Sequence, residues 1–87
     1  MNASQNDTSG IITSEQVRAG RALLGWTLER LIYASGVPKS TLIRFENAMV
    51  TPRASTMAAI RTALESAGVE FIPENGGGVG VRLRKKV

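Results

Sequence analysis

The stretch from Thr27 to Asn47 constrains the fold more than any other part of this 87-residue sequence. A short helix over 27–35 is followed by Gly36, which can adopt the positive φ that a sharp turn needs. Pro38 then opens a second helix that runs to about Asn47, because a proline at the first helical position loses no hydrogen bond. The sequence therefore predicts two short helices joined by a tight turn.

Within this stretch, apolar residues recur at spacings of three and four, as on one face of a helix. Four of them are predicted to face a shared core: Leu31, Val37, Leu42 and Phe45. The same spacing turns four side chains of the second helix outward: Lys39, Ser40, Ile43 and Arg44. An outward face of this kind is suited to reading the surface of another molecule.

The stretch resembles the helix-turn-helix of the Cro/cI-type regulators, the family also called xenobiotic-response-element-like, or XRE. The resemblance covers residues 15–69 and rests on these matches: Thr27, Leu31, Ala34-Ser35-Gly36-Val37, Ser40-Thr41-Leu42 and Phe45-Glu46-Asn47. It implies a mostly α, four-helix lambda-repressor-like domain of a bacterial or phage regulator. The expected function is sequence-specific binding of double-stranded DNA to regulate transcription.

The resemblance also implies which residues contact DNA. Lys39, Ser40 and Arg44 match the base-reading positions of the family, and Ile43 lies beside them. An arginine can bind O6 and N7 of a guanine together, whereas an isoleucine offers apolar contact such as a thymine methyl. Contacts with the DNA backbone are expected from Thr27, Pro38, Thr41, Asn47 and Arg53.

An ion pair between two helices is a further expectation. Arg21 falls on the inward stripe of the first helix, and a buried guanidinium needs a partner. Glu46 lies one turn after Leu42 and points toward the same edge of the core. The family has a buried salt bridge between residues of these types, so Arg21 and Glu46 are expected to form one. The alternative is that both are solvated surface charges.

Two positions keep other functions open. Leu28 stands where the family commonly has a glutamine that binds a phosphate, and Ile32 stands where it commonly has a small alanine. A protein-binding module that has lost its DNA contacts is therefore an alternative. A second alternative is an antitoxin-like regulator that binds both DNA and a partner protein, which predicts an additional exposed apolar surface.

Composition argues against most other classes of function. The sequence has no cysteine and no histidine, which excludes disulfides, thiolate metal sites and imidazole catalysis. Clustered carboxylates are also absent, so an enzyme is not expected, and neither a metal nor a cofactor is expected. No apolar run approaches the roughly 20 residues that span a bilayer, and residues 1–10 do not resemble a signal peptide. A cytoplasmic protein without membrane contact is expected.

The net charge of +4 is concentrated at one end of the sequence. Residues 1–80 carry seven basic and seven acidic side chains, so the excess comes from Arg82, Arg84, Lys85 and Lys86. Attraction to nucleic acid must therefore come from the placement of charges on one face and from this basic tail.

Three segments are expected along the chain. Residues 1–12 are predicted to be a disordered segment, since residues 1–10 are almost entirely polar. Residues 13–68 form the helix-turn-helix domain, in which Thr13 and Gln16 make a capping box and Ser55 caps the last helix. Residues 69–87 form a hairpin and the basic tail, since turn residues separate a β-branched run from an alternating one.

The hairpin is also the predicted dimerisation element. A lone hairpin is marginal in water, and its apolar side needs cover from another surface. The residues of that side are Phe71, Val79, Val81 and Leu83. A homodimer would match a palindromic operator, with recognition helices about 34 Å apart. The alternative is that the hairpin folds back on its own helices and the chain is monomeric.

Overall fold

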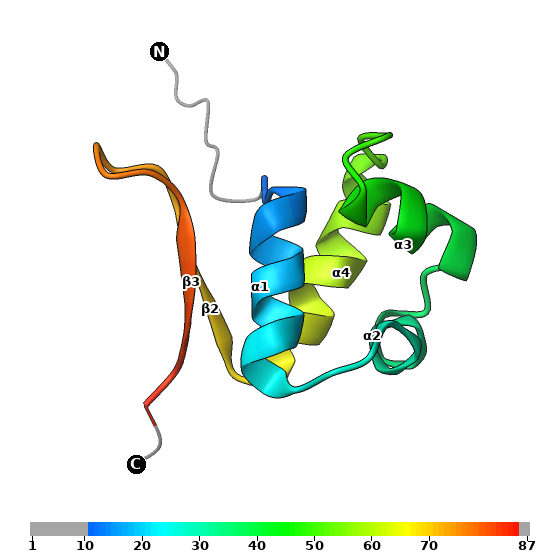
Figure 1. The fold of residues 1–87 in the computed structure, drawn as a ribbon, viewed down its shortest axis with the longest axis horizontal. Helices are drawn as coiled ribbons and strands as arrows, with labels where there is room; N and C mark the ends of the chain where they lie inside the picture. Colours follow the sequence, from blue (N-terminus) through cyan, green and yellow to red (C-terminus); the bar gives the residue numbers. More distant parts are fainter. Residues whose placement is uncertain (1–10, 86–87) are drawn as a thin grey trace.

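The computed structural model of the chain describes residues 11–85. These residues form four helices and an antiparallel hairpin: α1 (Ser14–Leu24), α2 (Leu28–Ser35), α3 (Lys39–Glu46), α4 (Ala54–Ser66), β2 (Val69–Ile72) and β3 (Gly80–Leu83) (Figure 1). The predicted fold, a mostly α four-helix domain with a C-terminal β-hairpin, is confirmed.

The predicted disordered segment 1–12 lies mainly outside the described residues. Ile12 is described, and it is buried in the core rather than part of a disordered segment. The reason is that Thr13 starts α1 immediately after it. The side-chain oxygen of Thr13 accepts a hydrogen bond from the backbone N–H of Gln16, and the Thr13 N–H donates to Oε1 of Gln16. This is the capping box that the sequence predicts.

Two helices begin at different residues from those predicted. Pro38 is the cap of α3 rather than its first residue, because its ψ of 147° is extended. Its φ of −59° satisfies either position, so the sequence alone does not separate them. Ser55 does not cap α4, since it is already the second residue of the helix and lies within the first turn, which the N–H of Met57 closes by donating to the carbonyl of Arg53. Arg53 is the cap residue of α4.

The core lies among the four helices and beneath the hairpin. Leu31, Val37, Leu42 and Phe45 are all buried, as predicted from their spacing. They pack with residues from every other element, among them Val17, Met57, Ile60, Leu64 and Val69. The helix-turn-helix therefore shares one core with α1, α4 and the hairpin.

The hairpin turns its apolar side toward the chain's own helices. Phe71 pairs with Val81 across the strands, and Phe71 is only 8% exposed. The side-chain amide of Gln16 in α1 donates to the carbonyls of Gly80 and Ile72, at 2.9 and 3.3 Å. These contacts attach the hairpin to α1 through buried polar groups that would otherwise lack partners.

Phe71, one of the predicted dimer-interface residues, lies in the core of its own chain, which leaves little of its side chain for a second copy. Val81 is half-buried against the same core. Val79 and Leu83 are 44% and 46% exposed, so these two of the four predicted residues keep substantial exposed surface. The alternative expectation, a hairpin folded back on its own helices, describes this part of the structure.

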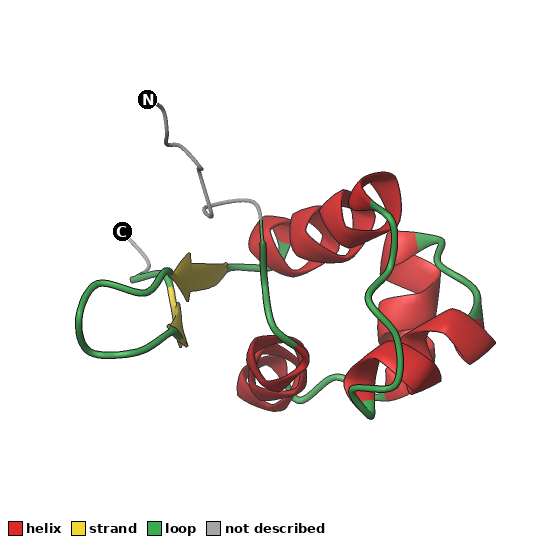
Figure 2. Cartoon of the chain, turned by 90° about the horizontal axis from the view of Figure 1, so that it is seen from above, coloured by secondary structure: helices red, strands yellow, loops and turns green. Residues whose placement is uncertain are grey.

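α1 separates the hairpin from α3. The hairpin lies on one side of α1 and α3 on the other (Figure 1). Viewed from above, the strands lie to one side of all four helices (Figure 2). α3 and the hairpin consequently lie on opposite sides of α1.

Ala48, which follows the C-cap residue Asn47 of α3, offers a test of backbone strain. It is the one non-glycine residue with positive φ among residues 11–85, at 59°. A left-handed conformation costs an alanine about 1–2 kcal/mol, and glycine avoids this cost. Since glycine also loses more backbone freedom on folding, we expect Ala48→Gly to raise the free energy of unfolding by about 0.5–1 kcal/mol. Urea denaturation measures this change.

The matched control is Ala58→Gly, on the exposed side of helix α4. There the alanine has ordinary helical geometry, so the same substitution is expected to lower the free energy of unfolding by about 1 kcal/mol. An equal loss at both positions would contradict the strain at Ala48.

Candidate nucleic-acid interface

The outer face of α3 collects the predicted base-reading residues. Lys39, Ser40, Ile43 and Arg44 are all exposed, whereas Leu42, Phe45 and Glu46 on the same helix are buried. Because Leu42 and Phe45 face the core, the exposed residues lie on the solvent side of the helix. The structure thus brings together two cations, a hydroxyl and one branched apolar side chain on a single helical face.

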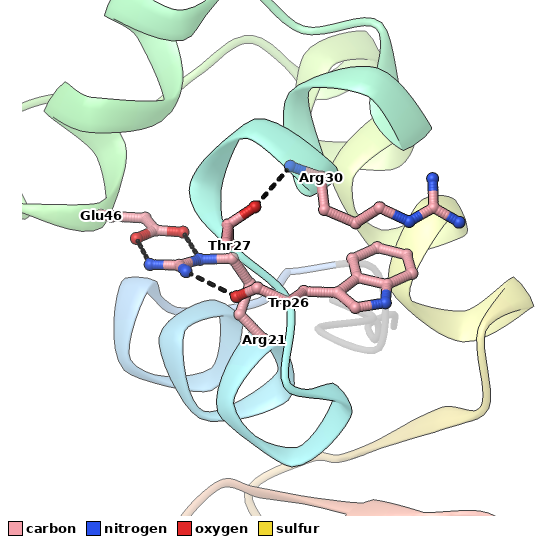
Figure 3. A network of polar contacts seen from close by, with 5 residues as sticks. All are labelled: Arg21, Trp26, Thr27, Arg30 and Glu46. Carbon is pink, nitrogen blue, oxygen red and sulfur yellow. Dashed lines mark hydrogen bonds and ion pairs between the residues drawn. The ribbon is translucent and has the colours of Figure 1, made fainter.

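α3 is fixed to α1 by a two-pronged ion pair. Nε and Nη2 of Arg21 donate to the two carboxylate oxygens of Glu46, at 2.8 and 2.7 Å (Figure 3). Nη1 of the same guanidinium donates to the carbonyl of Trp26 at 3.0 Å. One side chain therefore links the end of α3, α1 and the connection that leads into α2. This is the pair of residues that the sequence analysis expects.

The pair is largely removed from water. The side chains of Arg21 and Glu46 are 22% and 8% exposed. Hydrogen bonds to Glu46 raise the pKa of Arg21 above its usual value, so the guanidinium stays charged at every pH that the protein meets. Both carboxylate oxygens and two prongs of the guanidinium are used, which is the geometry that offsets the cost of desolvation.

The N-termini of α2 and α3 offer hydrogen-bond donors beside the outer face of α3. Thr27 caps α2, with its side-chain oxygen accepting from the N–H of Arg30 at 3.1 Å (Figure 3). Its own hydroxyl hydrogen stays available to donate. Pro38 gives α3 no side-chain cap, which leaves N–H groups of the first turn for an outside acceptor. A helix N-terminus with such groups favours an anion such as phosphate.

The other residues predicted to contact the DNA backbone differ in their exposure. Asn47 ends α3 and is exposed, and Arg53 is exposed at the start of α4. Both residues are accessible to a ligand. Thr41 is half-buried on the side of α3 between the outer face and the core. Leu28 and Ile32 are partly buried and pack against the core, so neither forms a polar contact surface.

Sequence reasoning missed two contacts made by side chains of α2. Glu29 on α2 lies 3.9 Å from Nζ of Lys39, in an exposed ion pair. The guanidinium of Arg30 lies 4.8 Å from the centre of the Trp26 ring and 5.6 Å from that of Tyr33. Residues three apart on a helix are neighbours, so the spacing of Arg30 and Tyr33 within α2 was a usable signal. Trp26 precedes the cap residue Thr27, so helical spacing gives no signal for its contact with Arg30.

The basic tail is not part of this face. β3 lies on the far side of α1 from α3 (Figure 1); Arg82 is part of β3, and Arg84 and Lys85 follow it in the sequence. Arg82 is paired with Glu70 on the neighbouring strand. The structure therefore keeps the two basic regions of the chain apart.

Comparison with known proteins finds no matching family model and no matching curated protein. Within residues 11–85, no helix is long and apolar enough to cross a membrane. The same residues contain no group of three metal-ligating side chains close enough to hold a metal ion. The case for a function therefore rests on the geometry of α3 and its surroundings.

Removal of Glu46 tests how much the domain depends on the ion pair. Glu46→Ala leaves the Arg21 guanidinium largely buried without its counter-charge, so we expect the free energy of unfolding to fall by about 3 kcal/mol or more. Thermal or urea denaturation measures the loss. Glu65→Ala is the control, because it removes the more exposed Arg61–Glu65 pair and should cost less than about 1 kcal/mol. Similar small losses for both variants would show that the Arg21–Glu46 pair contributes no more to the free energy of unfolding than an exposed ion pair does.

Proposed function

We propose that this protein is a sequence-specific DNA-binding transcriptional regulator. The observation that carries the proposal is the outer face of α3, where Lys39, Ser40, Ile43 and Arg44 are exposed together. A helix with donors and one apolar side chain on its free face fits the major groove, which admits an α-helix and presents acceptors and thymine methyl groups. The anchoring of α3 by Arg21 and Glu46 fixes the direction in which this face is presented.

In the proposed complex each residue has a distinct role. Arg44 binds O6 and N7 of a guanine with two hydrogen bonds and supplies most of the discrimination. Lys39 reaches a guanine or a phosphate, and it leaves the exposed contact with Glu29 at little cost. Ser40 donates or accepts with little preference between bases, and Ile43 contacts a thymine methyl.

Contacts with the phosphate backbone position the helix in the groove. The free N–H groups at the start of α3 and the hydroxyl of Thr27 point to where the backbone borders the groove. Asn47 and Arg53 extend the same contact line beyond the end of α3. These contacts carry no sequence information, but they fix the register in which Arg44 meets its base pair.

We propose further that two copies bind one palindromic operator. A two-fold dimer on one duplex needs both outer faces of α3 turned to the same side. The hairpin lies on the opposite side of α1 from α3, so a dimer joined through the hairpins would place the two α3 helices at its outer ends. Val79 and Leu83 are the exposed apolar residues through which two hairpins would meet.

A second candidate function is binding of a partner protein, and one feature favours it. A groove of about 600 Å³ lies between α2 and α4. Its lining includes small uncharged residues of α4, with Trp26 and Arg30 contributed from the α2 side. Surface helices usually carry charged residues on their outer side, so this neutral stretch is a suitable place for a partner helix to pack.

Arg44→Ala tests the regulator function. An operator is first selected from a random duplex library with the unaltered protein, and affinity is then measured by fluorescence anisotropy at fixed salt. Loss of a bidentate guanine contact should weaken operator binding by about 1–3 kcal/mol and relax the preference at one base pair. Arg18→Ala removes an exposed arginine of α1 and serves as the control.

The Arg18 variant is expected to keep both affinity and base preference. If Arg44→Ala also leaves both unchanged, α3 does not read DNA, and the partner-protein function becomes the better account. Failure of the unaltered protein to select any sequence would have the same consequence.

A further inference from the structure

The outer edge of β3 has no strand beside it. The sheet within residues 11–85 consists of β2 and β3 alone, and the strands lie to one side of the four helices (Figures 1 and 2). β3 is the more exposed strand, since Val69 and Phe71 of β2 are buried whereas Leu83 of β3 is exposed. An uncovered strand edge is a template for pairing with another strand.

The hydrogen bonds of the hairpin show which backbone groups of β3 point outward. The N–H of Arg84 donates to the carbonyl of Gly68, so these two residues form a hydrogen-bonded pair. Such pairs alternate with non-hydrogen-bonded ones along an antiparallel ladder, and the latter turn their N–H and C=O groups away from the partner strand. By this alternation Arg82 bonds to β2, whereas Val81 and Leu83 present their N–H and C=O groups at the free edge.

The apolar side of β3 is incompletely covered along the same edge. Val79 and Leu83 are 44% and 46% exposed, although each is two residues from the half-buried Val81 and lies on the same side of the strand. Leu23 of α1 is 42% exposed, and it lines a hollow of about 620 Å³ together with Leu83. An apolar side chain placed at this edge would therefore contact α1 as well as β3.

We infer that two copies of the chain join along β3, in antiparallel pairing centred on Val81, to form one continuous four-stranded sheet. The inference rests on the proposed function, since that function requires two copies on one operator. In this register Val81 meets Val81 of the second copy, and Leu83 lies opposite Val79 of the second copy. The outward backbone groups and exposed apolar side chains of each copy are thereby covered by those of the other.

Charge selects this register over its neighbours. Arg82 lies on the outer face of the sheet beside Glu70, its ion-pair partner. A register centred on Arg82 would set two Arg82 side chains directly opposite each other, and the next register along would set Arg82 opposite Arg84. Like charges directly opposite each other are destabilising. Pairing centred on Val81 instead places Arg82 opposite Gly80 of the second copy, which has no side chain.

Gly80 makes this register testable, because a side chain fits there within one copy. A Cβ at Gly80 would meet atoms of Ile72 at 3.8 Å or more, which is ordinary contact. Gly80→Glu places a carboxylate beside Arg82 of the second copy, whereas Gly80→Lys places a like charge there. Two-fold symmetry gives two such pairs, so we expect the dimer Kd to fall about 2- to 30-fold for the Glu variant and to rise by a similar factor for the Lys variant.

Sedimentation equilibrium of the full chain without DNA measures both changes. Circular dichroism melts check that each variant keeps the fold. The matched control is the same pair of charges at Ala58, which is exposed in the groove between α2 and α4. Ala58→Glu and Ala58→Lys are expected to leave the dimer Kd unchanged.

Amide hydrogen exchange of the unaltered chain gives a second measure that needs no variant. The N–H groups of Val81 and Leu83 have no partner strand in one copy, so pairing along β3 should slow their exchange as the protein concentration rises. The N–H of Arg82 bonds to β2 in either state and serves as the internal reference. Exchange at Val81 and Leu83 that does not depend on concentration would overturn the inference.

Three sedimentation results would also overturn the inference. One is a chain that stays monomeric up to its solubility limit. Another is an equal effect of Gly80→Glu and Gly80→Lys on the dimer, because the inferred register requires opposite effects. The third is a dimer that the Ala58 variants dissociate and the Gly80 variants leave intact, which would place the contact in the groove between α2 and α4.

Failure of the proposed function gives a different pattern. These measurements contain no DNA, so a chain that selects no operator but shows opposite effects of the two Gly80 variants would keep the β3 dimer and lose the regulator function. A monomeric chain that loses operator affinity through Arg44→Ala would keep the regulator function and lose the β3 dimer.

Discussion

The orientation of α3 depends on one desolvated contact, the ion pair of Arg21 and Glu46. α2 and α3 are eight residues each, and isolated helices shorter than about 12–15 residues are marginal in water. Their stability and direction must therefore come from tertiary contacts. Leu42 and Phe45 provide apolar burial, which is strong but not directional. The guanidinium adds direction, since its planar donors meet both oxygens of Glu46 and the carbonyl of Trp26 at fixed angles.

A buried charge pair is a poor source of net stability, because its attraction mainly repays the cost of removing both ions from water. Its value lies in the alternatives that it excludes. Any shift of α3 along α1 would separate Glu46 from Arg21 and leave two charges buried without partners. Apolar contacts tolerate small shifts far better. The ion pair therefore holds α3 in a single orientation, although the core beneath it is small. A helix that reads a DNA groove requires such a fixed orientation.

Residue spacing and capping patterns predicted those features of the structure that depend on neighbouring residues in the sequence. The spacing of Leu31, Val37, Leu42 and Phe45 gave the buried side of the helix-turn-helix, and Thr13 with Gln16 gave the start of α1. Pro38 and Arg53 could not be identified as caps, because the φ of a proline suits two positions and Arg53 has no capping side chain. The link from Gln16 to Gly80 spans 64 residues and has no local signature. Nor could the sequence show whether Phe71 would face its own helices or a second copy, since an alternating strand has an apolar side in either case.

The position of the hairpin determines which of its side chains are buried and which remain on the surface. Val69 and Phe71 complete the core from the far side of α1, and Gln16 holds both strands there. Once the apolar side is used in this way, Arg82 in β3 and the basic residues that follow it must remain on the surface. This basic surface is separate from α3, since α1 lies between the hairpin and α3. The place of the hairpin in the core therefore decides which charges the domain displays on each side of α1.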